Sequence, residues 1–183
     1  MKTITRQIRL RGIKPIMFDR YVDMKKQVPI EDKFYTTGEE RRLIFPAVNI
    51  LSFLSADLTE SATKRVMGRK WKSMAKAALS FVTIEPDLIP ITRNGEKLTV
   101  GNCGYIIDKR VARTKKTGGL IVPSEKERPV LPLPWEMEFE LTLVENDDLS
   151  EEQVKKIFIE GGYAIGLGTF RGLFGKFIVE KWE

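Results

Sequence analysis

The sequence predicts an α+β domain in which a mainly antiparallel sheet carries helices on one face. Two observations support this class: alternating segments typical of strands occur near both ends of the chain, and the C-terminal third runs strand, helix, strand. The length of 183 residues suits one compact domain with a true core. We therefore expect a single domain over residues 1–183, with insertions at about 19–40 and 93–134.

The N-terminal part begins with a strand and continues into a helix. Residues 3–11 alternate loosely between apolar side chains on one face and polar or basic ones on the other. Residues 19–40 are polar and lack a sustained period, as expected for an insertion or a partly mobile loop. Residues 42–45 predict a short strand, and Pro46 suits the first turn of the helix that follows.

A longer helix with one basic side is expected after residue 60. An apolar stripe from Met67 to Ala78 lies opposite four cations, and no acidic residue occurs between Glu60 and Glu85 to pair with them at i,i+4 spacing. A solvated helix face is the simpler interpretation, and a phosphate-binding ridge is the functional one. This basic ridge consists of Arg65, Arg69, Lys72 and Lys76.

The middle of the chain predicts strands and turns. Residues 81–84 fit a strand and residues 93–96 an Asn-Gly hairpin turn. Four prolines between Pro123 and Pro134 indicate an extended connector and not a regular element.

Five cations lie between positions 109 and 116, in what we expect to be a projecting hairpin. Such a hairpin either grips a nucleic-acid backbone or is a charged tip that keeps a sheet edge soluble. The five cations are Lys109, Arg110, Arg113, Lys115 and Lys116.

The C-terminal third gives the clearest pattern. Residues 135–144 alternate strictly, so they predict a strand with one core face and one acidic face. Ser150 and Gln153 match a capping box for a helix through about residue 160. Residues 175–183 fit a closing strand. The alternating glutamates of the acidic face are more typical of solvated charge than of a cation site, so we expect no metal.

Six of the fourteen glycines fall between Gly161 and Gly175. Their order does not match a dinucleotide-binding fingerprint, and no Walker A sequence is present. A helix C-cap followed by a bulged turn is one interpretation. The other is a tightly curled loop that presents amide N–H groups to an anion, with aromatic rings interleaved for stacking on bases. On the second interpretation the contact residues are Gly166, Gly168, Phe170, Arg171 and Gly175.

Composition excludes several kinds of chemistry. The chain has no histidine and one cysteine, so catalysis with a His base, a Cys/His zinc site and an intrachain disulfide are all excluded. We expect no cofactor. No targeting segment or membrane span is visible, so we expect a cytoplasmic protein. The net charge of +6 points weakly to an anionic partner.

Two stretches resemble one family. The order of helix, glycine-rich loop and final strand, with Gly166, Gly168, Arg171 and Gly175, resembles the signature of the RAMP superfamily of CRISPR-associated RNA-binding proteins. The segment from Ile44 to Ile50, with Pro46 and Asn49, is similar to the strand and helix start of its backbone subunits.

The resemblance covers about 25 residues at the C-terminus and fewer than ten near position 45, and it extends to proteins of phage and prophage genomes. It implies a ferredoxin-like (RRM-like) fold and RNA binding, with a homo-oligomer or related subunits along the strand. The basic residue that often follows the helix start is replaced here by Leu51, Ser52 and Phe53. Relatives that cleave RNA frequently use a histidine, and its absence here implies binding without cleavage.

The leading hypothesis is therefore non-catalytic binding of single-stranded nucleic acid, with RNA favoured, and assembly along the strand. One alternative is a structural or interaction subunit whose basic surfaces meet an acidic protein partner. Another is a carboxylate-metal nuclease using Asp19, Asp57 or Asp108, for which scattered acids give little support.

Overall fold

The computed structural model describes residues 2–22, 28–57, 59–115, 119 and 121–183, without the side chains of residues 112–115 and 121–122. The elements follow one another as β1 (Thr3–Gly12), β2 (Ile16–Met17), the 3-10 helix η1 (Ile30–Lys33), β3 (Thr36–Thr37), β4 (Arg42–Pro46), α1 (Ala47–Ser55), α2 (Ala62–Met67), the 3-10 helix η2 (Gly68–Lys70), α3 (Trp71–Phe81), β5 (Val82–Glu85), β6 (Leu88–Arg93), β7 (Glu96–Lys97), β8 (Ile106–Lys115), β9 (Ile121–Leu131), β10 (Glu136–Val144), α4 (Glu151–Ala164) and β11 (Phe177–Trp182).

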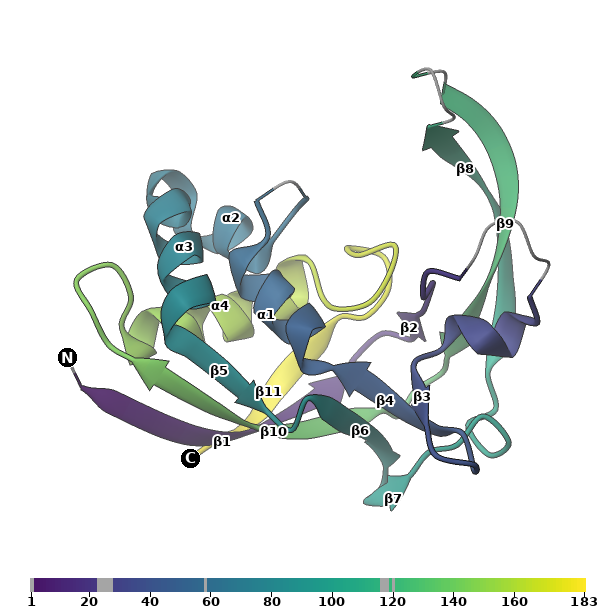
Figure 1. Cartoon of the computed structure of the whole chain (residues 1–183), viewed down its shortest axis with the longest axis horizontal. Coiled ribbons are helices and arrows are strands. Elements are labelled where there is room, and N and C mark those ends of the chain that lie inside the picture. The colour runs from purple at the N-terminus through teal and green to yellow at the C-terminus, as the bar shows by residue number, and fades with distance from the viewer. Residues whose placement is uncertain (1, 23–27, 58, 116–118, 120) are drawn as a thin grey trace.

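Four strands and the helices between them form a ferredoxin-like core. In the large sheet, β11, β1, β10 and β5 are neighbours in that order, and each pair is antiparallel. The chain passes from β1 through α1–α3 to β5, and from β10 through α4 to β11, which is the β-α-β-β-α-β order of this fold. The helices lie together above one face of the sheet (Figure 1). The predicted α+β class, with an antiparallel sheet and helices on one face, is confirmed.

An aromatic core fills the space between helices and sheet. Phe53 of α1 lies 5.5 Å from Phe158 of α4 and 5.6 Å from Phe177 of β11, measured between ring centroids. Trp135 is fully buried, and its indole N–H donates to the Lys14 carbonyl at 2.9 Å. Burial of each such side chain contributes roughly 1.5–3 kcal/mol relative to exposure. The aromatic residues therefore fix the helices against the sheet.

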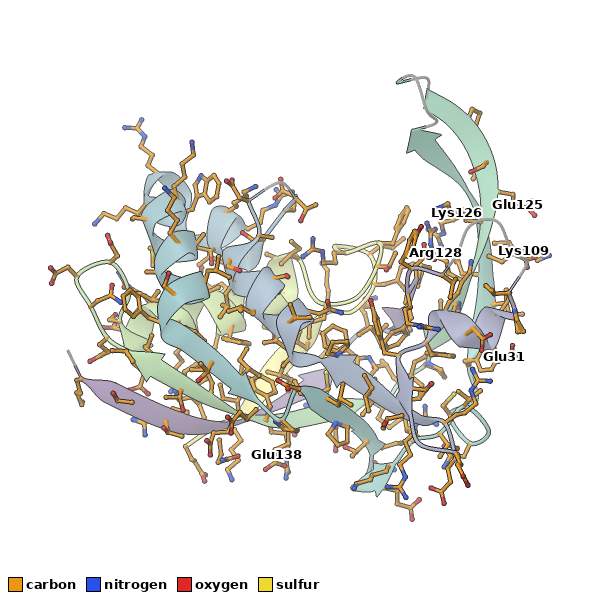
Figure 2. All side chains as sticks on the ribbon, in the orientation of Figure 1. Glu31, Lys109, Glu125, Lys126, Arg128 and Glu138 are labelled. Carbon is orange, nitrogen blue, oxygen red and sulfur yellow. The ribbon has the colours of Figure 1, made fainter. Side chains whose placement is uncertain are left out.

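The outer face of the sheet pairs the basic side of β1 with the acidic side of β10. Arg9 lies opposite Glu138 in register and forms an ion pair with it at 2.8 Å, while Arg11 pairs with Glu180 of β11 at 2.5 Å. Figure 2 shows Glu138 below the sheet, on the side away from the helices. The two charged faces predicted from the sequence are thus one surface on which opposite charges meet.

A smaller sheet of β2, β9 and β8 stands beside the large one, and the β8–β9 hairpin projects from the molecule (Figure 1). The projecting hairpin and the Asn-Gly turn between β6 and β7 are confirmed. The expectation of an irregular connector over Pro123–Pro134 is wrong, because β9 extends through Leu131. Proline has no N–H to donate, so it fits a strand only where that hydrogen bond is not needed. Pro123 and Pro129 can meet this condition, because one edge of β9 pairs with β8 and the other pairs with β2 only at the C-terminal end of β9.

The expected single helix after residue 60 is divided into α2, η2 and α3. Gly68 adopts a φ of +57°, which a continuing helix does not allow, so the chain turns there. Met74 and Ala78 are buried as the apolar stripe predicts, whereas Met67 is only partly buried.

The range 19–40 contains η1 and β3. Phe34, which is 1% exposed, packs there against Phe18 at 5.1 Å between ring centroids, so the described part of this range contributes to the core. Among the described residues, no helix combines the length and apolar character needed to cross a bilayer.

Candidate nucleic-acid interface

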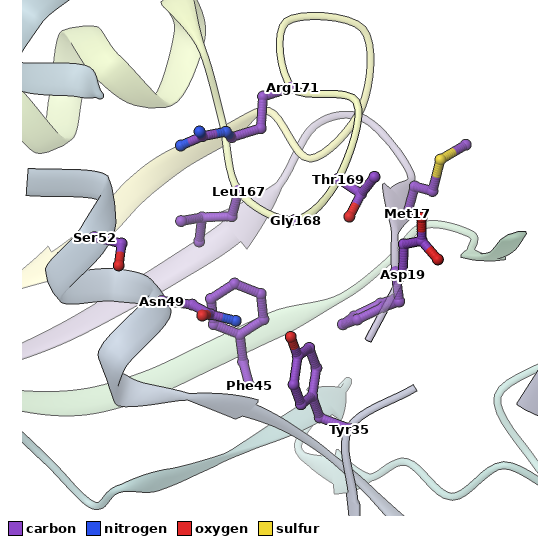
Figure 3. Close-up of a pocket in the computed structure, with 11 residues that line it drawn as sticks. Met17, Asp19, Tyr35, Phe45, Asn49, Ser52, Leu167, Gly168, Thr169 and Arg171 are labelled. Carbon is purple, nitrogen blue, oxygen red and sulfur yellow. The ribbon is translucent and has the colours of Figure 1, made fainter. Parts of the chain in front are cut away.

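The two stretches that carry the family resemblance meet at one pocket. It lies between the first turns of α1 and the loop that follows α4, and has a volume of about 210 Å³ (Figure 3). Asn49 and Ser52 line it from α1, and Gly168 and Arg171 line it from the loop. The remaining lining residues are Met17, Phe18, Asp19, Tyr35, Phe45, Leu167 and Thr169. Segments more than 100 residues apart in the chain thus form a single site.

The loop between α4 and β11, residues 165–176, needs glycine at three predicted positions. Gly166, Gly168 and Gly175 have φ values of +73°, +79° and +71°, in the region that side chains disfavour. A Cβ on Gly168 would lie 2.5 Å from the Met17 carbonyl oxygen. The neighbouring Thr169 N–H donates to that same oxygen at 2.9 Å, which ties the loop to β2.

The predicted display of glycine amides to an anion is largely wrong. The Gly166 N–H donates to the Gly161 carbonyl at 3.0 Å, and the Gly175 N–H to the Pro15 carbonyl at 2.7 Å, so both are used within the fold. The Gly168 N–H makes no hydrogen bond with any residue that the structure describes, and Gly168 lines the pocket. One backbone donor, and not three, is therefore available to an anion from these glycines.

Two of the six glycines belong to α4, which extends to Ala164 and not only to residue 160. A Cβ on Gly161 would lie 2.5 Å from the Ala62 Cβ, and one on Gly162 would lie 2.5 Å from the Phe177 carbonyl oxygen. These glycines let α4 approach α2 and β11 closely. The glycine-rich loop is shorter than the sequence suggests because close packing uses part of the glycine cluster.

Arg171 is a half-buried cation without a partner. Its side chain lines the pocket and makes no hydrogen bond or ion pair within the described part of the chain. Burial lowers the pKa of its guanidinium below the ordinary value, and the negative charge of Glu60 acts in the opposite direction. Because arginine stays protonated at neutral pH and no carboxylate in the described part of the chain forms an ion pair with it, the site holds a positive charge that an anionic group can neutralise.

The β8–β9 hairpin has two different faces. Asp108, Arg110, Lys126 and Arg128 share one face, because residues directly opposite in an antiparallel pair point the same way. In Figure 2, Lys126 and Arg128 point towards the body of the molecule, whereas Lys109 points away from it. The sequence spacing therefore assigned these cations to one site, although they belong to two surfaces of the hairpin.

The predicted hairpin cations differ in what they contact. Lys109 forms an ion pair with Glu127 on the outer face of the hairpin, so its side chain points away from the glycine-rich loop. Arg110 is bonded to both carboxylate oxygens of Asp108, at 2.6 and 2.5 Å, which raises the Arg110 pKa and lowers that of Asp108.

The Arg110 guanidinium also lies 4.8 Å from the ring centroid of Phe170 and 5.2 Å from that of Phe174. This contact joins the hairpin to the glycine-rich loop. We call the surface formed by Gly168, Phe170, Arg171, Phe174, Arg110 and Lys126 the loop-hairpin surface.

Three further predicted cations are not tested by this geometry. Arg113 and Lys115 lie in β8, but their side chains are outside the described set, and Lys116 lies outside the described residues altogether.

The basic ridge lies apart from the loop-hairpin surface. In Figure 1, α2 and α3 are on the far side of α1 from the hairpin. Arg65 is paired at 3.1 Å with Glu60, which lies five residues before it in the sequence and not at i,i+4 spacing. Arg69, Lys72 and Lys76 are exposed on α3 and η2. The structure does not bring Arg69, Lys72 and Lys76 together with the other predicted residues, whereas Arg65 is linked to Arg171 through Glu60, which acts electrostatically on both.

Two of the three carboxylates considered for a nuclease site, Asp19 and Asp108, are paired with arginines, whereas the structure gives the Asp57 carboxylate no partner among the described residues. Asp19 accepts a hydrogen bond from Arg128 at 2.7 Å, and Asp108 is held by Arg110. Within the described part of the chain, no group of three or more Cys, Asp and Glu residues comes close enough to hold a metal ion.

No protein-family model matches the chain, and no curated protein matches it. The chain is similar in structure to a chain of the cryo-EM structure of type III-B Cmr-beta bound to cognate target RNA. The TM-score is 0.56 at 12% sequence identity, over 100% of this chain and 60% of that chain. The likeness is one of fold. The protein thus shares the α+β architecture of that chain and spans about three fifths of its length.

Sequence reasoning missed Lys126 and Tyr35, which the structure places at or near this surface. Lys126 was missed because the prolines argued against a strand in this stretch. Lys126 lies in that strand, β9, directly opposite Arg110. Tyr35 lies in a polar range with no periodic signal, so nothing in the sequence pointed to it.

Proposed function

We propose that this protein binds single-stranded nucleic acid, with RNA as the target, on the loop-hairpin surface. The observation that carries the proposal is Arg171, an unpaired, half-buried cation at the pocket where the two motifs meet. Anionic phosphate satisfies such a group, and the exposed ring of Phe170 beside it offers a surface for an unstacked base. The fold shared with a chain from an RNA-bound assembly favours RNA over DNA.

Binding without cleavage is part of this proposal. The chain has no histidine to serve as a general base, and Asp19 and Asp108 are paired with arginines, which disfavours their use as metal ligands. Metal-dependent hydrolysis of the bound strand would contradict it.

We also propose that the protein is a member of the RAMP superfamily and that several copies, or related subunits, assemble along one strand. The ferredoxin-like topology and the meeting of the two resembling stretches at one pocket support this. Within this proposal, residues 19–40 and 93–134 are insertions into a single domain, and the second of them supplies the hairpin.

The test is a fluorescence anisotropy titration of single-stranded RNA of about 20 nucleotides, a length that covers more than one typical binding site. The same sequence is titrated as DNA and as a duplex, over a series of salt concentrations. We expect RNA to bind most tightly, and the logarithm of the association constant to fall linearly with the logarithm of salt concentration, by about 0.7 for each phosphate contacted.

The variant Arg171→Gln should weaken binding roughly 10- to 100-fold, the loss expected for a charge-assisted hydrogen bond, and should reduce the salt slope by about 0.7. Arg9→Gln is the matched control, because Arg9 lies on the outer face of the sheet and should leave binding unchanged. Absence of salt-sensitive binding to every single strand would overturn the proposal and would favour the acidic protein partner.

A further inference from the structure

Phe170 combines a strained backbone with an exposed side chain, in a turn closed by the hydrogen bond from the Phe174 N–H to the Phe170 carbonyl at 3.2 Å. Its φ of +57° is in the left-handed region, which is unusual for a bulky residue, and 44% of the residue is exposed. Strained, exposed aromatic residues on loops are typical of functional positions, because packing alone does not maintain them. The ring of Phe174 lies 6.5 Å away between centroids, at an angle of 77°.

The face of each ring is covered by a cation from another part of the chain. Arg110 reaches from β8 and places its planar guanidinium over both rings, at 4.8 and 5.2 Å. Asp108 holds the other side of the guanidinium with two hydrogen bonds. The guanidinium thus lies where a nucleobase could stack on one ring, while the other ring, at 77° to the first, would face the edge of the base.

An anion that replaced the aromatic rings as the partner of Arg110 would meet a second cation beside it. Lys126 lies directly opposite Arg110 in the hairpin register, and it makes no ion pair with the residues that the structure describes. The Arg110 side chain is 29% exposed, so the guanidinium can leave the rings without opening the core. A phosphate arriving at this face would therefore contact both cations.

We propose that Phe170 and Phe174 form a stacking site for one unpaired nucleobase, which Arg110 covers in the free protein and vacates for a phosphate when a strand binds. This inference rests on the proposed binding of single-stranded nucleic acid and assigns the base contact within it. Stacking of a base on an aromatic ring is generally worth more than an exposed cation–π contact, and a phosphate can take the place of Asp108 as the anionic partner of the guanidinium, so both terms support the exchange. Because every base has a π-face, the site reads the presence of a base and not its identity.

The experiment compares two strands with the same phosphates, oligouridylate of about 20 nucleotides and a ribose-phosphate strand of equal length without bases. The wild type should bind oligouridylate more tightly. Phe170→Asn removes the ring, while asparagine tolerates the left-handed backbone. This variant should lose roughly 5- to 100-fold in affinity for oligouridylate, the loss measured for one stacked base, and little for the base-free strand.

Leu173→Ala is the matched control, since Leu173 is an apolar residue of the same loop that is 56% exposed, against 44% for Phe170. It should bind both strands as the wild type does. Phe174→Leu keeps apolar volume and removes the second ring, and it should also reduce the preference for the strand with bases. Arg110→Gln should retain that preference, and its salt slope should be smaller by about 0.7.

The outcomes separate the two proposals. If the wild type binds neither strand, the proposed function fails. If it binds both, but Phe170→Asn and Phe174→Leu bind them as the wild type does, the stacking site is overturned and the function stands. An unchanged salt slope in Arg110→Gln would show that Arg110 only joins the hairpin to the loop, and would overturn the exchange.

Discussion

At the scale of single residues, Arg128 is a nearly buried cation whose charge must be compensated within the fold. It is 6% exposed, and its Nε donates to Asp19 at 2.7 Å, while its Nη1 is buried without a hydrogen bond to any described residue. Asp19 in turn lines the pocket. The charge of Arg128 is therefore tolerated in the base of the hairpin because Asp19 pairs with it and Asp108, directly opposite in the hairpin, adds a further attraction.

We predict that Asp19→Ala lowers the free energy of unfolding by about 2–4 kcal/mol. This is somewhat less than the 3–5 kcal/mol typical of a fully buried pair, because 23% of the Asp19 side chain remains exposed. Chemical denaturation measures the change. Glu40→Ala removes a carboxylate from the exposed pair with Arg42 and should cost under about 1 kcal/mol. Equal costs for the two variants would contradict the prediction, as would a double variant Asp19→Leu, Arg128→Met no more stable than Asp19→Ala alone.

Single residues also show that sequence spacing does not determine which charged side chains share a surface. Arg171 was predicted as a contact residue, and it lines the pocket. Lys109 and Arg110 are adjacent in the sequence and were assigned to one site, but strand alternation sends them to opposite faces. Which face meets the loop depends on the docking of the hairpin against β2, and no local pattern encodes that docking.

At the scale of elements, the contact between α4 and α2 is set by glycine. Gly161 lies where a Cβ would meet the Ala62 Cβ at 2.5 Å and the Phe53 ring at 2.9 Å. Alanine is intrinsically the better helix former by about 1 kcal/mol. Overpacking of a close contact costs typically 1–3 kcal/mol, so the steric effect exceeds the gain in helix propensity.

We therefore predict that Gly161→Ala destabilises the protein by up to about 2 kcal/mol, the overpacking cost less the propensity gain, as seen by a lower thermal midpoint. Lys156→Ala, at an exposed position of α4, controls for the effect of alanine in this helix and should change stability by less than about 0.5 kcal/mol. A Gly161→Ala protein more stable than the wild type would show that α4 can shift away from α2 at no cost.

The elements were predicted best where a local chemical signal defines them. The capping box of Ser150 and Gln153 marks the start of α4, and both of its hydrogen bonds are present. The end of α4 was placed too early, because paired glycines usually end a helix and here serve the packing against Ala62 and Phe177. The β9 strand was missed for a similar reason, since prolines normally exclude a strand and are accepted at a largely unpaired edge.

At the scale of the whole molecule, the described cations of α3 and η2 lie on a different surface from Arg110 and Arg171. The basic ridge lies on α2, η2 and α3, on the far side of α1 from the hairpin (Figure 1). The ferredoxin-like order was expected from a resemblance of about 25 residues and is present, but the distance between the two surfaces follows from tertiary structure alone. A strand must be long enough to reach both.

We predict that a variant combining Arg69→Gln, Lys72→Gln and Lys76→Gln binds a strand of roughly 6 nucleotides as the wild type does. With a strand of roughly 30 nucleotides its affinity should fall at least tenfold, and its salt slope should decrease by about 0.7 for each lost phosphate contact. Anisotropy titrations of both strands provide the measurement. Equal loss on both strands would mean that the ridge and the loop-hairpin surface act as one site.

The paired outer face of the sheet also affects how fast a partner arrives. Arg9 and Arg11 are cancelled by Glu138 and Glu180 there, and Glu136 and Glu140 add further negative charge. The net charge of +6 therefore comes from the rest of the molecule, which makes the protein electrically asymmetric. In the field of a polyanion such a molecule is turned during diffusion so that its helices and hairpin lead. A larger share of encounters is then productive, and the association rate constant, more than the dissociation rate constant, falls as salt is added.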